Sequence, residues 1–320
     1  MKKILYIQAI HPAGMDRLRE KYDVVVAKST DLENLMEEVR DASVIVSRLT
    51  RVDRELIDAG TQLKAICKNG VGVDNIDVAY ATEKGIPVLT TGDGNLWSVA
   101  EHTVFAMGAL CKKLVFFDRS MREGNWKSRD CGGFYDVAGR TFGVVGFGKI
   151  GRDVAGIVKA FRMNVMAYDP FLPREVIEQA GCAYAASLEE LCRNADVISL
   201  HMPLTKENVH VINDESLSWM KPSAILMNFA RGLLVDEDAL YRALAEHRLA
   251  GAALDTFAPE PPDFSHPLYQ LDNVLLSPHI AGNSEDALRR MSLNLAEGIE
   301  AVLSGQVPKS CANKKELYGL

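Results

Sequence analysis

Residues 141–151 read Thr141-Phe142-Gly143-Val144-Val145-Gly146-Phe147-Gly148-Lys149-Ile150-Gly151. An apolar strand pattern here runs into a GxGxxG motif and then into a helix-like segment. Gly146 permits a tight turn, Gly148 lets the backbone approach a pyrophosphate, and Gly151 allows helix and strand to pack closely. The start of the helix offers its N–H groups and the positive end of its dipole to phosphates. The stretch therefore predicts a dinucleotide-binding site.

A second strand pattern supports this interpretation. Residues 163–168 are followed by Asp169, roughly 20 residues beyond the glycines, where an acidic side chain binds a ribose 2′-hydroxyl. No arginine is adjacent to accommodate a 2′-phosphate, so the sequence predicts NAD rather than NADP. The alternative is a glycine-rich turn in some other parallel α/β protein.

Composition limits the class of protein. A chain of 320 residues exceeds what one hydrophobic core usually supports, so we expect two domains. Hydrophobic residues make up 48% and charged residues 25%, which is ordinary for a globular protein, and no apolar run is long enough to cross a bilayer. We expect no membrane residence, and we interpret the apolar start of the chain as a first strand rather than a signal peptide.

Charge and cysteine usage exclude further classes. A net charge of −7 argues against nucleic-acid binding, which needs a basic footprint to displace phosphate counterions. The 6 cysteines form no CxxC pair and show no histidine at metal-ligand spacing. We therefore expect no metal site, and reduced thiols in the cytoplasm.

Short β-branched runs alternate with helical patterns almost from end to end, which is typical of βαβ units and parallel sheets. The expected strands lie at residues 4–7, 24–26, 44–46, 63–67 and 87–89, and, after the glycine loop, at 165–168, 197–200, 224–228, 252–254 and 274–277.

Two long helical stretches, residues 98–122 and 284–304, fall outside this alternation and could cross between domains. We expect an α/β fold with two doubly wound parallel-sheet domains separated by a cleft. A Rossmann NAD-binding domain at residues 99–284 would be inserted into a discontinuous, flavodoxin-like substrate-binding domain at 1–98 and 285–320. The tail, residues 311–320, is expected to be loosely ordered.

Three polar segments each follow a predicted strand, namely residues 228–232, 255–262 and 277–282. They place Arg231, Glu260 and His279 at the carboxyl edge of the sheet, where ligands bind in open α/β folds. Taken singly, these residues are more often a surface ion-pair partner, a solvated loop acid and a structural histidine. Their joint position after three strands favours one site.

The three side chains match a particular chemistry. Hydride transfer between a nicotinamide and a 2-oxo or 2-hydroxy acid needs a proton donor, a cation for the carboxylate and carbonyl, and a group that tunes the donor. His279, Arg231 and Glu260 fit those roles in that order, because a carboxylate beside an imidazole favours the protonated ring.

Over nearly its whole length the chain resembles the D-isomer-specific 2-hydroxyacid dehydrogenases. Besides the glycine loop and the three polar segments, the resemblance is carried by Gly70-Val71-Gly72-Val73-Asp74-Asn75-Ile76-Asp77, Val99-Ala100-Glu101-His102, Tyr168-Asp169-Pro170 and Leu200-His201-Met202-Pro203-Leu204-Thr205. The resemblance implies that Arg231, Glu260 and His279 are the catalytic set. It also implies NAD contacts at Thr91, Lys149, Ile150, Asp169, Met202, Phe229, Ala230, Asp255 and Gly282.

His201 and Pro203 follow the strand at 197–200 on the same cofactor edge, where we expect His201 to support the nicotinamide side rather than act as an acid. The resemblance implies that the substrate carboxylate meets the backbone amides of the Gly70–Gly72 loop, at Val71 and Gly72. A glycine-bracketed loop after a strand can turn successive N–H groups toward an anion, although it can also be a simple tight turn.

Arg48 is a further candidate for the substrate, together with Arg231 and His279. Many members of the family carry Arg-Ser where this chain has Ser47-Arg48, so the guanidinium is displaced by one position.

The sequence thus predicts an NAD-dependent reductase of a small 2-oxo acid such as hydroxypyruvate or glyoxylate. A 3-phosphoglycerate dehydrogenase is the alternative, and an NADH-sensing, corepressor-like binding protein is a more remote one. The resemblance implies a homodimer with the 98–122 helix at its interface. Because the chain ends at residue 320, we expect no C-terminal regulatory domain and no allosteric control by serine.

Overall fold

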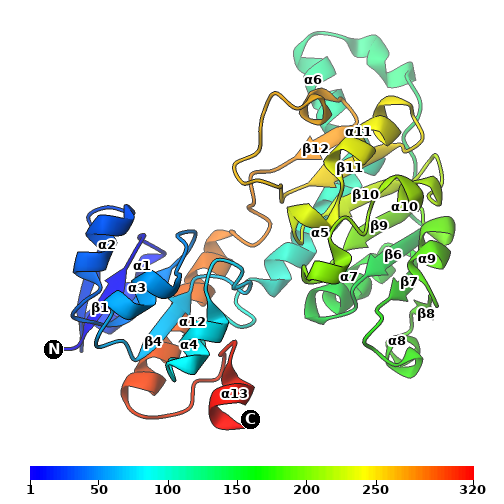
Figure 1. Ribbon diagram of the computed structural model, residues 1–320. Coiled ribbons are helices and arrows are strands. Elements are labelled where there is room, and N and C mark those ends of the chain that lie inside the picture. The colour runs from blue at the N-terminus through cyan, green and yellow to red at the C-terminus, as the bar shows by residue number, and fades with distance from the viewer. The chain divides into compact units, whose positions relative to one another are not determined.

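The computed structural model describes residues 1–320 and contains two compact α/β units (Figure 1). Unit 1 consists of Met1–Asn95 and Asn283–Leu320, and unit 2 consists of Leu96–Gly282. Each unit contains one sheet in which all strand pairs are parallel. The predicted fold class, α/β with two parallel-sheet domains, is confirmed.

Unit 1 is built on a 5-stranded sheet in the order β2-β1-β3-β4-β5, which is the flavodoxin-like order. Its strands are β1 (Lys3–Tyr6), β2 (Asp23–Val26), β3 (Ala42–Ser47), β4 (Ala65–Lys68) and β5 (Val88–Leu89). Its helices are α1 (Pro12–Arg19), α2 (Leu32–Glu38), α3 (Arg54–Ala59), α4 (Val78–Glu83), α12 (Glu285–Leu303) and α13 (Lys314–Tyr318).

Both faces of this sheet are covered. Successive residues of β1 point to opposite faces, so Leu5 joins the core beneath α2 and α3, while Ile4 and Tyr6 join the core beneath α1 and α12. A strand buried on both faces favours apolar residues at successive positions, which is why Ile4–Tyr6 of β1 and Val44–Val46 of β3 are continuous apolar runs.

Unit 2 is built on a 7-stranded sheet in the order β12-β11-β10-β9-β6-β7-β8. Its strands are β6 (Thr141–Val145), β7 (Asn164–Tyr168), β8 (Ala183–Tyr184), β9 (Val197–Leu200), β10 (Ile225–Asn228), β11 (Gly251–Leu254) and β12 (Val274–Leu276). Its helices are α5 (Leu96–Cys111), α6 (Leu114–Arg122), α7 (Lys149–Ala160), α8 (Arg174–Gln179), α9 (Leu188–Asn194), α10 (Asp214–Ser218) and α11 (Glu237–Ala245). Its short 3₁₀ turns are η1 (Trp126–Asp130), η2 (Lys206–Asn208), η3 (Gly232–Leu234) and η4 (Pro267–Gln270).

The order of the second sheet places a ligand site. The strand order reverses between β6 and β9, since β7 and β8 follow on one side of β6 and β9 to β12 follow on the other. Ligands of open α/β sheets bind outside the carboxyl ends of the strands at such a switch point. The loop after β6 carries the glycine motif, and the segment after β9 begins with His201.

The long helical stretch expected at residues 98–122 is interrupted. Lys113 has a left-handed backbone with φ 49°, and it separates α5 from α6. The other long stretch is one helix, α12, whose start is capped by Ser284 accepting a hydrogen bond from the Ala287 N–H. None of the helices combines the length and the apolar character that crossing a membrane requires.

The expectation of a loosely ordered tail is wrong. Cys311 forms an antiparallel bridge with Leu89, and Asn313 is only 1% exposed. The Asn313 side chain accepts a hydrogen bond from the Val88 N–H at 2.9 Å and donates one to the Ile86 carbonyl at 3.0 Å. These bonds fix the segment to β5, and the short α13 follows.

Candidate active site

The glycine loop of unit 2 has the geometry that a dinucleotide pyrophosphate requires. Gly146 has φ 92°, and a Cβ there would lie 2.7 Å from the Met202 nitrogen. A Cβ at Gly151 would lie 2.3 Å from the Gly146 carbonyl oxygen. At Gly148, which caps the start of α7, a Cβ would meet nothing within 4 Å. Gly146 and Gly151 thus allow the loop to pack closely on its neighbours, and the position of Gly148 is open to an approaching ligand.

Asp169 lies at the end of β7, beside this loop. One carboxylate oxygen accepts a hydrogen bond from the Phe147 N–H at 2.8 Å, and the other accepts one from the Phe171 N–H at 2.9 Å. The side chain therefore holds the glycine loop as well as standing where a ribose would bind.

Arg231 is fixed by the turn that follows β10. Asn228, which is 1% exposed, accepts a hydrogen bond from the Ala230 N–H at 3.1 Å and donates one to the Arg231 carbonyl at 2.8 Å. A Cβ at Gly232 would lie 2.1 Å from the Phe257 carbonyl carbon, so only glycine allows this approach. The Arg231 segment consequently packs directly on the segment that carries Glu260.

Glu260 and His279 form a hydrogen-bonded pair. The Nδ1 atom of His279 lies 2.8 Å from one carboxylate oxygen of Glu260, and the other oxygen accepts a hydrogen bond from the Phe257 N–H at 3.1 Å. Burial opposes ionisation of Glu260, yet the hydrogen bonds from His279 and Phe257 and the charges of His279 and Arg231 hold its pKa below the usual range. An ionised carboxylate only accepts hydrogen bonds, so Nδ1 of His279 carries the hydrogen.

The loop that carries His279 is wrapped around Asp255. This carboxylate is 1% exposed and accepts hydrogen bonds from the Ser277 hydroxyl at 2.6 Å, the Ile280 N–H at 2.9 Å and the Ala281 N–H at 2.8 Å. His279 lies within this loop and has a left-handed backbone, with φ 52°. Asp255 was expected to contact the cofactor, and in the structure its carboxylate organises the His279 loop.

His201 follows β9 at the switch point of the sheet. Its Nε2 atom is buried without a hydrogen-bond partner, and burial lowers the pKa of the ring to about 4. The ring is therefore neutral near pH 7.

The remaining predicted cofactor residues of unit 2 lie at the start of α7 and beyond the carboxyl ends of β9, β10 and the edge strand β12. Lys149 and Ile150 open α7, Met202 and Pro203 follow β9, Phe229 and Ala230 follow β10, and Gly282 ends the loop after β12. Thr91 belongs to unit 1, where it is fully buried and its N–H donates to the Gly70 carbonyl at 3.1 Å.

The predicted substrate loop lies in unit 1, after β4. Gly70 has φ 157°, Val71 is 46% exposed, and no backbone hydrogen bond within the protein uses the N–H of Val71 or Gly72. Two successive amides presented in this way suit an anion.

Sequence reasoning missed the side chains that hold the segment of Arg48 and Thr50. The Lys68 ammonium donates to the Arg48 carbonyl and to the Asn75 side chain, and Gln8 accepts a hydrogen bond from the Arg48 N–H at 3.1 Å. Asn75 also donates to the Thr50 carbonyl at 2.7 Å. Lys68 ends a strand, which is the signal that could have identified it, whereas Gln8 gave none.

No group of three or more His, Cys, Asp or Glu side chains is placed to hold a metal ion. What unit 2 offers instead is an imidazole held by a carboxylate, with a guanidinium whose charge reaches the same carboxylate. Such a set can exchange a proton and can bind an anionic group.

Comparison with known proteins agrees with this geometry. Residues 104–281 match the family described as "D-isomer specific 2-hydroxyacid dehydrogenase, NAD binding domain". The cofactor of unit 2 is therefore a nicotinamide dinucleotide, which the open face at Gly148 and the position of Asp169 accommodate.

Several relatives align with 98% of this chain, among them a dehydrogenase and a reductase. One is a D-3-phosphoglycerate dehydrogenase of Methanocaldococcus jannaschii, 42% identical over 314 residues, of which this chain spans only 60%. The other is a glyoxylate reductase of Thermococcus onnurineus, 38% identical over 325 residues and covered to 97%. Among solved structures, the NADPH-dependent glyoxylate/hydroxypyruvate reductase of Sinorhizobium meliloti, in complex with NADP and malonate, superposes with a TM-score of 0.87 at 28% identity, covering 98% of both chains.

Proposed function

Because the chain belongs to the D-isomer-specific 2-hydroxyacid dehydrogenase family, we propose that it is an NAD-dependent reductase of small 2-oxo acids such as glyoxylate or hydroxypyruvate. The observation that carries the proposal is the pair of His279 and Glu260, 2.8 Å apart, with the charge of Arg231 acting on the same carboxylate. The pair stands at the carboxyl edge of the sheet that also holds the glycine loop.

Each residue has a role in the proposed reaction. When bound, the nicotinamide supplies the hydride for reduction of the substrate's carbonyl carbon and accepts it in the reverse direction. His279 gives a proton to the carbonyl oxygen from Nε2, because its Nδ1–H is held by Glu260. Arg231 binds the carboxylate and polarises the carbonyl, and Glu260 stabilises the protonated ring.

The cofactor-binding roles predicted for unit 2 belong to the same proposal. The amides at the start of α7 would bind the pyrophosphate, and Asp169 would bind the ribose and disfavour a 2′-phosphate. His201, neutral and buried, would line the nicotinamide side.

In unit 1, we propose that the loop of Gly70, Val71 and Gly72 binds an anionic group. The two N–H groups without a partner in the protein support this assignment. Arg48 is a second cationic candidate, because its backbone is held beside this loop by Lys68 and Gln8. The two units correspond in this proposal to an NAD-binding and a substrate-binding domain.

The proposal is tested by steady-state oxidation of NADH against glyoxylate, hydroxypyruvate, phosphohydroxypyruvate, pyruvate and a branched 2-oxo acid. NADPH replaces NADH in a parallel series. We expect one small 2-oxo acid to lead by kcat/KM, with NADH preferred. No turnover with any of them, although NADH binds, would contradict the proposal and favour a cofactor-sensing protein.

Oxidation of 3-phosphoglycerate is a second candidate. It is favoured by two cationic residues, since a substrate phosphate needs cations. They are Lys68, which ends the strand before the substrate loop, and Arg48, whose backbone carbonyl accepts a hydrogen bond from the Lys68 ammonium. The 42% identity to a phosphoglycerate dehydrogenase points the same way. In the assay above, a lead of phosphohydroxypyruvate over hydroxypyruvate would select this candidate.

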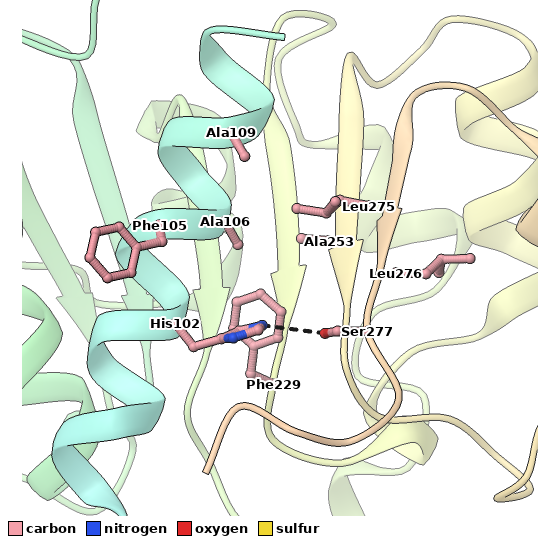
Figure 2. Close-up of a pocket in the computed structure, with 9 residues that line it drawn as sticks. All are labelled: His102, Phe105, Ala106, Ala109, Phe229, Ala253, Leu275, Leu276 and Ser277. Carbon is pink, nitrogen blue, oxygen red and sulfur yellow. Dashed lines mark hydrogen bonds between the residues drawn. The ribbon is translucent and has the colours of Figure 1, made fainter. Parts of the chain in front are cut away.

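We also propose a homodimer formed through α5 and α6. Unit 2 exposes Phe105 to 72%, Val115 to 60% and Leu114 to 56%, and a pocket of about 230 Å³ lies beside Phe105 (Figure 2). Exposed large apolar side chains on two successive helices are typical of interfaces. Sedimentation should give twice the monomer mass, and Phe105→Asp should shift the species toward monomer. A wild-type monomer would contradict this proposal.

The cytoplasmic location rests on the six unpaired cysteines and stays a prediction. Fractionation of cells that express the chain from its own gene would test it.

A further inference from the structure

His102 connects two segments of the candidate active site. It lies on α5, and its Nε2 atom is 3.3 Å from the Ser277 hydroxyl (Figure 2). Its ring also meets the ring of Phe229 edge-on, with centroids 5.1 Å apart and planes at 89°. Ser277 precedes His279 by two residues, and Phe229 precedes Arg231 by two residues.

The direction of the hydrogen bonds follows from Asp255. The Ser277 hydroxyl donates to the Asp255 carboxylate at 2.6 Å, so its oxygen accepts from the Nε2–H of His102. The same carboxylate takes the N–H groups of Ile280 and Ala281. A hydrogen-bonded chain therefore runs from α5 through Ser277 and Asp255 into the backbone on the far side of His279.

The other contact of His102 reaches the Arg231 side. Phe229 is 7% exposed and belongs to the core of unit 2, so its ring has little freedom to move away from His102. A T-shaped contact of this kind is favourable and depends on ring orientation. One side chain thus touches the segments that carry both proposed catalytic cations.

We propose that His102 is a positioning residue that fixes the position of the His279 loop relative to the Arg231 turn. It acts through Ser277 and Phe229, the two side chains that its ring contacts, and both lie two residues from a proposed catalytic residue. The kinetic part of this proposal rests on the proposed function, whereas the structural part concerns the 277–282 loop alone.

Four variants separate this role from ordinary packing. His102→Phe keeps a ring against Phe229 and removes the N–H, whereas His102→Gln keeps an N–H donor of similar reach. Ser277→Ala removes the acceptor. His247→Asn is the matched control, because His247 is an exposed histidine on a turn with φ 55° in the same unit.

Hydrogen–deuterium exchange of the peptide containing residues 277–282 is the first readout, and it needs no substrate. We expect faster exchange at Ile280 and Ala281 in His102→Phe and Ser277→Ala, wild-type exchange in His247→Asn, and largely restored protection in His102→Gln. Unchanged exchange in both His102→Phe and Ser277→Ala would overturn the proposal.

Kinetics with the best 2-oxo acid give the second readout. His102→Phe should lower kcat about tenfold with little change in the KM for NADH, as expected for one lost hydrogen bond that orients the reacting groups. The double variant with Ser277→Ala should lose no more than the larger single loss, because the His102–Ser277 hydrogen bond that His102→Phe removes is already absent in Ser277→Ala. Additive losses, or equal activity of His102→Phe and wild type, would overturn it.

These readouts keep two failures apart. If wild type turns over no 2-oxo acid, the proposed function fails, while exchange of the 277–282 peptide still decides the role of His102. If His102→Phe melts far below wild type, Ser277→Ala carries the test, since Asp255 keeps two N–H donors in that variant.

Discussion

Two histidines follow strands of the same sheet in unit 2, and their surroundings differ. His201 follows β9, where its Nε2 atom is buried without a partner and burial lowers its pKa to about 4. His279 follows β12, where half of its side chain is exposed and Glu260 lies 2.8 Å from Nδ1. Residue type and position in the fold are alike, so the local environment separates the two rings: burial keeps the His201 ring neutral near pH 7, and a carboxylate holds the His279 ring.

The comparison shows how one sheet edge can hold two imidazoles without confusing their roles. Burial keeps the His201 ring neutral, which suits a site beside a cofactor ring. A carboxylate with a lowered pKa faces the His279 ring and accepts the hydrogen of its Nδ1 atom. The predictions below change each environment in turn.

Removing the ring of His279, which follows β12, should have the largest effect on kcat. His279→Gln is expected to lower kcat by about a thousandfold, since general acid catalysis contributes roughly 10²–10⁴. NADH binding, followed by fluorescence titration, should stay within about twofold of wild type because the glycine loop is untouched. Retention of wild-type turnover would show that another group supplies the proton.

Removing the cation beside this pair should be the next most damaging change. Arg231→Gln takes away the group proposed to bind the carboxylate and polarise the carbonyl, and it should lower kcat/KM for the 2-oxo acid by about a hundredfold. Arg231→Lys is the matched control, which keeps the charge but loses the planar fork, and it should recover part of the loss. Full activity in Arg231→Gln would exclude a substrate role.

Neutralising Glu260 removes the contact that sets His279 apart from His201. Glu260→Gln takes away the carboxylate that accepts the Nδ1–H of His279 and leaves a weaker, neutral acceptor. We expect kcat/KM for reduction to fall about tenfold, because the ring that gives the proton is less firmly oriented. Because the pKa of Glu260 lies below its usual range, wild type should show no loss from Glu260 protonation above about pH 5. An unchanged kcat/KM in Glu260→Gln would contradict the pairing.

At the cofactor end of the sheet, Asp169→Ser should shift preference from NADH toward NADPH by about tenfold in the ratio of kcat/KM values. Asp169→Asn is the informative control, because an amide oxygen can still accept the Phe147 N–H while the charge is gone. If charge sets the preference, both variants shift the ratio. A shift in Asp169→Ser alone would assign the effect to the loop hydrogen bond.

The smallest kinetic effect is expected from a change of His201, which follows β9. His201→Gln should change kcat less than about threefold, because a neutral buried ring carries no proton near pH 7. Its effect should instead be seen in stability against pH. With a folded pKa of about 4 and an unfolded pKa near 6.5, His201 is protonated first in the unfolded state, so the free energy of unfolding falls as pH drops from about 6.5 to 4.

This loss is on the order of 1–3 kcal/mol at its largest, and it should be smaller in His201→Gln. Chemical denaturation at several pH values checks it. Equal slopes in the two proteins would show that folding does not lower the pKa of His201.

Much of the architecture could be predicted because its determinants are local in the sequence. Strands β1, β3 and β9 are short β-branched or apolar runs, and the glycine loop encodes its own turn in consecutive residues. The interruption at Lys113 could not be predicted, since the apolar pattern continues through Leu114 into α6 and a left-handed lysine leaves no sequence signal.

The candidate site divides in the same way. Arg231, Glu260 and His279 could be chosen because each follows a strand, and all three side chains belong to unit 2. Their supports could not be chosen, because the partners are distant in sequence. Asp255 holds a loop that lies more than twenty residues further on, and His102 reaches Ser277 across 175 positions.

The most direct test compares the two histidines in one experiment. We would measure kcat for His279→Gln and His201→Gln side by side, with saturating NADH and the best 2-oxo acid. The account predicts that His201→Gln exceeds His279→Gln by more than about a hundredfold. Equal values for the two variants, or a lower value for His201→Gln, would contradict the assignment of the proton to His279.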